Sequence, residues 1–160
     1  MDGPDHLGEP MRVAPATAAD AGDWAGMREA LWPSGGDHGT HAEDIARLLA
    51  DPGDTLNLIA RHADGVALGF AEAGLRHDYV NGCDSSPVAF LEGIYVTPEA
   101  RKQGVARALI AAIEAWARSK GLTELASDAA LDNIGSHGMH HALGFAETQR
   151  VVFFKKTLSN

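Results

Sequence analysis

Cysteine is almost missing from this chain of 160 residues, which contains only Cys83. A single thiol cannot form a disulfide within the chain, and it cannot supply a thiol pair or a cysteine-rich zinc site. Such usage is typical of a reducing compartment, so we expect a cytoplasmic protein. Cys83 itself lies in the polar turn NGCDSS, where we expect it to be incidental rather than a nucleophile.

Long apolar runs are missing as well, because no stretch approaches the roughly 18 residues that cross a membrane. The first ten residues, MDGPDHLGEP, are acidic and rich in Gly and Pro, whereas an export signal begins with basic and then apolar residues. We therefore expect neither export nor a membrane partner. Residues 1–11 read as a flexible tail.

Basic residues are few, with 13 Lys and Arg against 22 Asp and Glu and a net charge of −9. Residues 1–54 hold 11 of those 22 acids but only 3 of the 13 bases, so the negative field is concentrated there. Such a surface makes nucleic acid a poor partner, and it would attract a polycationic small molecule. An acidic surface that serves only solubility is the alternative.

The hydrophobic fraction of 45% is ample for one core, so residues 1–160 are expected to form a single domain. Cap residues, glycine stops and apolar spacing predict helices and short strands in mixed order. The helices are expected over 17–31, from 40 to about 50, over 104–120 and over 134–143; the strands are expected over 56–61, 66–75, 88–96, 125–130 and 150–156.

The strand predicted over residues 88–96, VAFLEGIYV, is apolar on both faces, so it should be central in the sheet. Gly93 in its middle suggests a bulge or a close approach of another group to the backbone. After this strand the sequence RKQGVA gives the pattern R-x-x-G-x-A and then a strongly amphipathic helix. A glycine loop that leads into a helix presents free amides to an anion. The Walker Lys-Ser/Thr pair is absent, which disfavours ATP.

In this context the chain resembles the GCN5-related N-acetyltransferase (GNAT) family, whose acyl-CoA pyrophosphate loop reads Q/R-x-x-G-x-G/A after the fourth strand. The segments LRHDYVNGCDSSPVAFLEGIYV, ASDAALDN and HALGFAETQRVVFFKK are closely similar to the aminoglycoside 6'-N-acetyltransferases of that family, and LWP at 31–33 is a further match. The resemblance implies an α/β fold with a mixed, mostly antiparallel sheet flanked by helices and a splay between two central strands. It implies an enzyme that transfers acetyl from acetyl-CoA to the 6'-amine of an aminoglycoside and so confers resistance.

The resemblance also implies how acetyl-CoA is held. The pantetheine arm would pair with the backbone of Ile94, Tyr95 and Val96, with the side chain of Asn133 on the opposite side. The amide near Val96 would polarise the acyl carbonyl. The pyrophosphate would lie on the loop and helix start formed by Arg101, Lys102, Gln103, Gly104, Val105, Ala106 and Arg107.

Two carboxylates are candidates for work on the acceptor amine. Glu92 interrupts an apolar strand, and an isolated carboxylate there is costly unless it is paired or functional, so it is the best candidate for an acid/base group. A structural salt bridge with an arginine is the alternative. Asp128 follows a predicted strand beside the splay, where it should hold an amino group; a turn-forming or helix-capping Asp is the alternative.

Other acceptor contacts are implied by the resemblance. Trp32 and Tyr79 match aromatic positions that line the aminoglycoside site, and the polar sequence around each argues for exposure. Two residues depart from the family pattern. His140 stands where many members have a Tyr as general acid, although water could protonate the thiolate instead. Gln149 stands where close relatives tend to have a Glu that faces the antibiotic.

The histidines at 137, 140 and 141 share one helix face, but no carboxylate or thiol in that helix completes a metal site, so no metal is expected. The resembled enzymes are commonly homodimers, and the last predicted strand, VVFFKK, is a plausible edge for pairing. Two alternative functions stay open. The same fold could acetylate a polyamine or a protein amine, or it could be a non-catalytic acyl-CoA sensor, which would require neither Glu92 nor Asp128.

Overall fold

The computed structural model describes residues 11–33 and 39–160. They contain a five-stranded sheet in the order β1-β2-β3-β4-β5. The first four strands pair antiparallel, while β5 runs parallel to β4. This is the mixed, mostly antiparallel sheet that the family resemblance implied. The strands are β1 (Met11–Pro15), β2 (Thr55–His62), β3 (Ala67–Arg76), β4 (Val88–Val96) and β5 (Leu125–Ser127).

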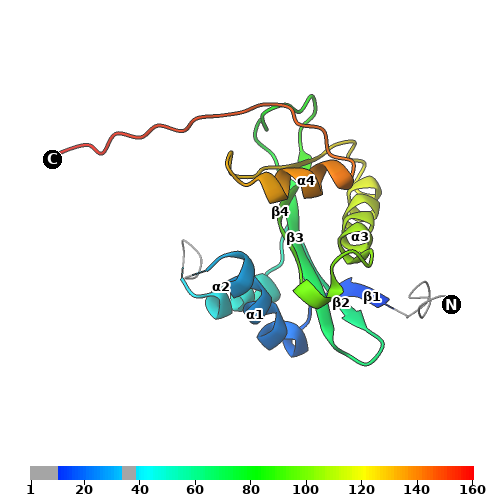
Figure 1. The fold of residues 1–160 in the computed structure, drawn as a ribbon. Coiled ribbons are helices and arrows are strands. Elements are labelled where there is room, and N and C mark those ends of the chain that lie inside the picture. Colours follow the sequence, from blue (N-terminus) through cyan, green and yellow to red (C-terminus); the bar gives the residue numbers. More distant parts are fainter. Residues whose placement is uncertain (1–10, 34–38) are drawn as a thin grey trace.

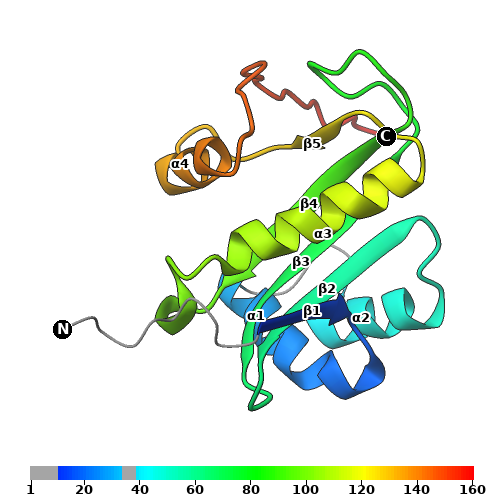
Figure 2. The same cartoon turned by 90° about the vertical axis from the view of Figure 1, so that its right-hand side faces the viewer.

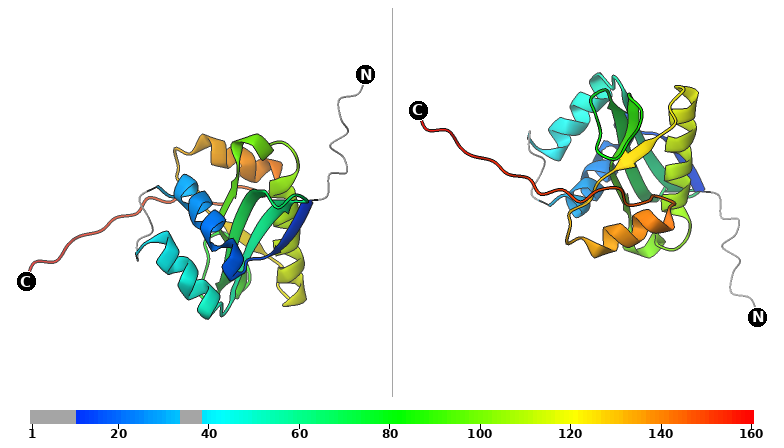
Figure 3. Two further views of the ribbon diagram at one scale, coloured as in Figure 1. Left: turned by 90° about the horizontal axis from the view of Figure 1, so that it is seen from below. Right: turned by 90° about the horizontal axis from the view of Figure 1, so that it is seen from above.

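Helices cover both faces of the sheet (Figure 1). The helices α1 (Ala21–Leu31) and α2 (His41–Ala50) lie on one side, and α3 (Val105–Ser119) lies on the other, as the end-on views in Figure 3 show. The short helix α4 (Ile134–Ala142) follows β5, and single 3-10 turns at Ala18–Asp20 and Pro98–Ala100 precede α1 and α3.

Alternation along the strands divides the apolar side chains between two cores, because successive strand residues point to opposite faces. Leu58 and Ala60 of β2 pack in the core beneath α3, whereas Ile59 between them packs beneath α1 and α2. Ala71 and Phe70 of β3 divide in the same way. Figure 2 shows α3 lying across the sheet on the face that carries the first of these cores.

Local signals explain the helix boundaries. At the start of α2 the Thr40 hydroxyl accepts from the Glu43 amide at 3.1 Å, and the Glu43 carboxylate accepts from the Thr40 amide at 3.4 Å, which is the capping box expected from sequence. Gly104 precedes α3 with φ of 83°, and Gly121 follows it with φ of 75°. Both are left-handed conformations that glycine adopts without strain.

The two ends of the sheet differ from the prediction. Met11–Pro15 pairs with β2 as an edge strand that the sequence analysis did not identify; of the predicted tail, Met11 begins this strand and residues 1–10 lie outside the described part. The predicted strand over 150–156 was wrong, and the predicted strand over 125–130 ends at Ser127. In Figure 1 the C-terminal segment runs away from the sheet, so it has no neighbouring strand to pair with. In the described part of the chain, no helix is long and apolar enough to cross a membrane.

Candidate functional site

The central strands part where β5 ends. Strand β4 pairs with β5 only from Ala89 to Leu91, opposite Leu125 to Ser127, and β4 then continues alone on that side to Val96. Asp128 directly follows β5 and is exposed. The predicted splay is therefore formed, with the backbone of Ile94–Val96 on one side of it.

Glu92 occupies a β-bulge at this point. Across the β3–β4 ladder, Glu72 pairs with Gly93 and Ala73 pairs with Leu91, so Glu92 is an extra residue without a partner position. A bulge bends its strand and turns the extra side chain out of the regular alternation. This explains why Glu92 is exposed although it interrupts a buried apolar strand.

The Glu92 carboxylate is paired with Arg76, the last residue of β3. Arg76 Nη2 donates to both carboxylate oxygens at 3.0 Å, and Arg76 Nε donates to Oε1 at 3.3 Å. The guanidinium also lies 3.6 Å from the ring centroid of Phe90. Both charged side chains remain 44% exposed. The salt bridge considered from sequence is thus present, but it leaves the carboxylate accessible. Arg76 was not predicted from the sequence as a partner of Glu92.

The turn before α3 has the backbone that an anion site requires. Lys102 and Gly104 adopt positive φ values of 63° and 83°, and the first intrahelical bond runs from the Ala108 amide to the Gly104 carbonyl at 3.0 Å. The amides of residues 105–107 therefore project from the helix N-terminus. A Cβ added at Gly104 would meet no atom within 4 Å, so the space above this turn is open.

Two side chains of the turn have structural contacts. Arg101 Nε donates to the Val96 carbonyl at 3.1 Å, and Gln103 Nε2 donates to the Glu99 carbonyl at 3.0 Å. The first bond attaches the turn to the end of β4, and the second attaches it to the 3-10 turn Pro98–Ala100. Lys102 in the turn and Arg107 in the first turn of α3 are both exposed. The arrangement can bind a phosphate group with amides and two cations.

His140 is tied to the end of β5. Its Nδ1 donates to the Ser136 carbonyl at 2.7 Å, because a carbonyl oxygen can only accept, and its Nε2 lies 2.8 Å from the Ser127 hydroxyl. Ser127 also lies 3.3 Å from the Leu91 carbonyl. This chain of polar groups crosses the point where β4 and β5 part. Ser127 was not identified from sequence, although it stands next to Asp128 in ASDAALDN.

A cavity of about 1280 Å³ collects most of the acceptor-side candidates. It lies beside β5 and α4. Trp32 and Glu92 are not among its lining residues, but Arg76 and Phe90, which contact one another beside Glu92, are. The predicted site residues in its wall are Tyr79, Asp128, His140 and Gln149.

Tyr79 is 72% exposed, as expected from the polar segment around it. That segment is fixed by Glu124, whose carboxylate accepts from the amides of Asp84 and Ser85 and from the Ser85 hydroxyl. The hydroxyl bond lowers the pKa of Glu124, and burial raises the pKa of the nearby Cys83 thiol. A raised thiol pKa does not suit a nucleophile, which agrees with the expectation for Cys83.

Trp32 is half-buried, whereas its sequence context favoured exposure. Its indole meets Phe70 edge to face, with ring centroids 6.1 Å apart. It also lies directly against Gly93, because a Cβ at that glycine would come within 2.4 Å of the indole Cζ2. The close approach expected at Gly93 is therefore that of an aromatic ring, in addition to the bulge.

The remaining candidates have local partners. Asn133 caps α4, since its Oδ1 accepts from the Ser136 amide at 3.1 Å, so its Nδ2 is the group left for a ligand. His137 Nε2 donates to the Ala130 carbonyl at 3.0 Å. Within residues 11–33 and 39–160, no three His, Cys, Asp or Glu side chains are grouped as a metal site.

Comparison with known proteins gives a consistent result. The sequence model of the Acetyltransferase (GNAT) family matches residues 24–145. The chain is 53% identical, over 135 residues, to an aminoglycoside N(6')-acetyltransferase type 1 of Serratia marcescens; the match covers 84% of this chain and 91% of that protein.

Two solved structures are similar throughout. One is the aminoglycoside 6'-N-acetyltransferase AAC(6')-Ih from Acinetobacter baumannii, with a TM-score of 0.87 and 45% identity over 94% of this chain and all of that one. The other is AAC(6')-Iy in complex with the bisubstrate analogue CoA-S-monomethyl-acetylneamine, with a TM-score of 0.84 and 47% identity over 93% and 99% of the two chains. The phosphate turn, the parted strands and these matches agree: the chain belongs to the GNAT family of acetyltransferases.

Proposed function

We propose that this protein is an aminoglycoside 6'-N-acetyltransferase that uses acetyl-CoA and confers resistance to the antibiotics it modifies. One observation carries the proposal: an accessible carboxylate, Glu92, lies on a bulge of β4 at the point where β5 ends, and the same strand leads into the phosphate-binding turn. The proteins named above for this activity, and the bisubstrate complex of one of them, support it.

The donor acetyl-CoA fits the residues beyond Glu92. Its pyrophosphate would bind the amides at the start of α3, above the open space at Gly104, with Lys102 and Arg107 as counter-charges. The pantetheine arm would bind the backbone of Ile94–Val96, opposite the Nδ2 of Asn133. We also infer a cytoplasmic location, because acetyl-CoA is an intracellular metabolite and the lone Cys83 is a free thiol.

The acceptor amine reacts directly with the thioester. The nitrogen lone pair attacks the acetyl carbonyl, the C–N bond forms, the C–S bond breaks, and the CoA thiolate leaves. The amine must first lose its ammonium proton, and Glu92 accepts it directly or through water. Asp128 holds an amino group of the polycation, while Tyr79 and Trp32 contact its sugar rings.

The leaving thiolate needs a proton. We propose that His140 supplies it through Ser127, whose hydroxyl lies 2.8 Å from Nε2 at the end of β5. In this scheme Ser127 receives the imidazolium proton and passes its own to the sulfur, so His140 ends neutral with Nδ1–H still bonded to the Ser136 carbonyl.

One assay tests the acceptor. Purified protein and acetyl-CoA are incubated with aminoglycosides, polyamines or histone-like peptides side by side, and CoA release and product mass are measured. We expect acetylation of aminoglycosides that carry a 6'-amine, located on that ring by mass spectrometry, and none of otherwise similar compounds with a 6'-hydroxyl. If only spermidine or only a peptide is acetylated, the acceptor is a polyamine or a protein amine and not an aminoglycoside. If the protein binds CoA but acetylates no amine, it is an acyl-CoA sensor.

We further propose that the active protein is a homodimer in which each copy covers the C-terminal segment of the other. Val152, Phe153 and Phe154 are 69%, 89% and 92% exposed, and the segment leaves its own domain (Figure 1). Exposed apolar residues in a row mark an interaction surface. The outermost strand β5, at the end of the sheet order, offers an edge where residues 150–156 of a second copy could pair.

Sedimentation of the full chain tests this assembly. We expect the wild type to be a dimer and the double variant Phe153→Asp with Phe154→Asp to be a monomer. The reason is that two aromatic side chains proposed to be buried between the copies are replaced by charged ones. Leu158→Ser is the matched control, since Leu158 is also an apolar residue, 81% exposed, but lies beyond the predicted pairing segment. A monomeric wild type with full activity would contradict the proposal.

A further inference from the structure

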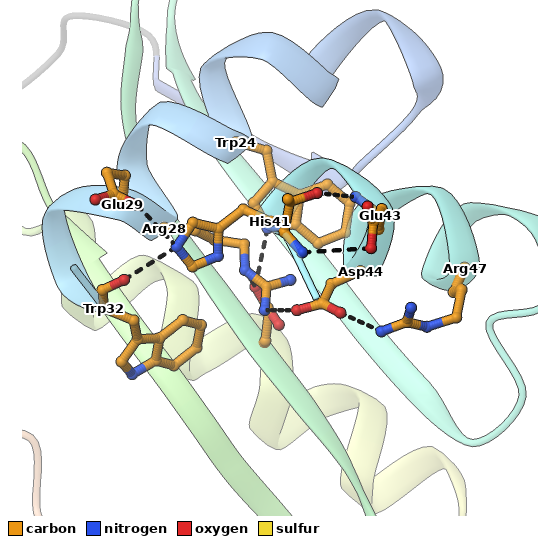
Figure 4. A network of polar contacts seen from close by, with 10 residues as sticks. Trp24, Arg28, Glu29, Trp32, His41, Glu43, Asp44 and Arg47 are labelled. Carbon is orange, nitrogen blue, oxygen red and sulfur yellow. Dashed lines mark hydrogen bonds and ion pairs between the residues drawn. The ribbon is translucent and has the colours of Figure 1, made fainter. Parts of the chain in front are cut away.

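A buried cluster of charges ties α1, α2 and β3 together (Figure 4). Arg28 of α1 is its centre: Nη2 donates to Asp44 of α2 at 3.3 Å, and Nε lies 3.5 Å from Glu72 of β3. Trp24 Nε1 donates to the same Glu72 oxygen at 3.0 Å. Arg28 and Glu72 are each only 7% exposed.

Stability alone is a weak reason for this cluster. Burial raises the pKa of the Glu72 carboxyl, although the charge of Arg28 and the Trp24 N–H act in the opposite direction. Buried ion pairs are often no more stabilising than apolar residues of similar volume. In addition, no acceptor among the described residues reaches Arg28 Nε or Nη1 in a hydrogen bond, although both atoms are buried.

The Arg28 guanidinium also contacts an aromatic ring. Trp32 is the residue that directly follows α1, and the guanidinium carbon of Arg28 lies 5.2 Å from its indole centroid. A cation over an indole face is attracted by the ring quadrupole, most strongly when water is excluded. This contact gives the buried guanidinium an attractive interaction that needs no hydrogen-bond acceptor.

Trp32 is held from two further sides. Its backbone carbonyl accepts from His41 Nε2 at 3.0 Å, and His41, the first residue of α2, is only 6% exposed. The far edge of the ring lies against Gly93, the residue after Glu92. The charge cluster is therefore connected, through one indole, to the bulge that carries the proton acceptor.

We propose that Arg28 is a positioning residue for the acceptor sugar: it orients the Trp32 indole over Gly93 so that the ring meets the aminoglycoside beside Glu92. This inference rests on the proposed role of Trp32 in acceptor binding. The competing explanation is that apolar packing against Phe70 and Gly93 alone holds the indole.

The test replaces the charges without changing volume. Arg28→Met alone leaves Glu72 buried without its cation, which can prevent folding, so the informative variant is the double substitution Arg28→Met with Glu72→Gln. Arg47→Met is the matched control, because Arg47 pairs with Asp44 of the same cluster but is 57% exposed at the surface, on the side of Asp44 away from Arg28. Trp32→Ala reports whether the indole contacts the acceptor at all.

Steady-state kinetics are measured for each variant with both substrates. We expect the double variant to raise the aminoglycoside KM about tenfold, as for loss of a desolvated cation–π contact, with the acetyl-CoA KM and kcat within about twofold. Trp32→Ala should raise the same KM at least as much, and Arg47→Met should change nothing. Arg28→Lys, which keeps a charge over the ring, should recover part of the loss.

The outcomes distinguish the role of Trp32 in acceptor binding from the role of Arg28 in positioning Trp32. If Trp32→Ala leaves the aminoglycoside KM unchanged, the acceptor role of Trp32 is wrong and the role of Arg28 is overturned with it. If Trp32→Ala raises the KM but the folded double variant does not, the acceptor site stands and Arg28 has no positioning role. The fluorescence of Trp32 is obtained by subtracting the spectrum of the matching Trp32→Phe variant. We expect its emission to shift in the double variant and to stay the same in Arg47→Met. An unchanged Trp32 emission in the double variant also counts against the proposal.

Discussion

The pairing of Glu92 with Arg76 makes the proposed proton acceptor testable by comparing two single substitutions. Glu92→Gln keeps an oxygen that accepts from Arg76 but removes the ability to take a proton at neutral pH. Arg76→Met removes the ion pair and keeps the carboxylate. If Glu92 is only a salt-bridge residue, the two variants should behave alike.

The magnitudes separate the two explanations. Both side chains are 44% exposed, and exposed ion pairs contribute about 0–1 kcal/mol, so loss of the ion pair should lower the free energy of unfolding of each variant by no more than about that. A missing general base costs about 10²-fold or more in turnover, which is about 2.7 kcal/mol. We expect that loss in kcat for Glu92→Gln only, with Arg76→Met within about fivefold of wild type.

The assay measures CoA release at saturating kanamycin-type acceptor, together with acetyl-CoA affinity by calorimetry and unfolding by denaturant. Acetyl-CoA affinity should be nearly unchanged in both variants, because neither side chain lies in the phosphate turn. An equal loss of kcat in the two variants would assign Glu92 to the salt bridge. Near-normal turnover of Glu92→Gln across pH would refute the reasoning altogether.

Three further predictions follow from the donor turn, the acceptor carboxylate and the buried cluster. Gly104→Val should weaken acetyl-CoA binding by about 1 kcal/mol, or fivefold, because a branched side chain is strained at a φ of 83° and enters the open space above the turn; unchanged affinity in a folded variant would remove the phosphate assignment. Asp128→Asn should lower kcat/KM for the 6'-amine about thirtyfold, or about 2 kcal/mol, because the amine loses one charged partner. If the fold-change in kcat/KM is no larger than the fold-change in acetyl-CoA affinity, Asp128 does not hold the acceptor amine. The folded pKa of Glu72 lies above its ordinary value of 4.5, so its contribution to stability is present below that value and is lost as pH rises through the folded pKa. The unfolding free energy of wild type relative to Glu72→Gln should therefore fall as the pH rises above about 4.5, and a constant difference would refute the burial effect.

Much of the fold was predictable because local signals and tertiary packing agree. The strand over 88–96 was predicted with its observed bounds and its central position, and the helix over 104–120 differs by one residue at each end. In both, the apolar pattern matches the core that the segment enters. The glycines at 104 and 121 supply the left-handed turns that bound α3.

The failures occur where a segment depends on distant or missing partners. Met11–Pro15 is a strand only because β2 lies beside it, and MRVAP carries no strong alternation by itself. Residues 150–156 have a strong strand composition, but composition cannot supply a neighbour, and the segment leaves the domain. Strand propensity therefore identified a sequence that can pair without indicating what it pairs with.

For the candidate site, the sequence drew attention to unusual residues but did not indicate their partners. Glu92 was noticed because a carboxylate in an apolar strand is unusual, yet the bulge depends on the register with β3, and Arg76 is 16 residues away along the chain. Ser127 was missed because a serine at a strand end has no distinctive pattern until His140 is placed beside it.

The contact between Gly93 and Trp32 has an evolutionary consequence. Any side chain at position 93 must occupy space that the indole now fills, so the residues at positions 32 and 93 are expected to change together in evolution. We expect related sequences that carry a larger residue at 93 to carry a smaller one at 32, and single changes at either position to be selected against. Because the indole borders the proposed acceptor site, such paired changes would alter which antibiotics fit, and a resistance spectrum could broaden through linked substitutions that neither position tolerates alone.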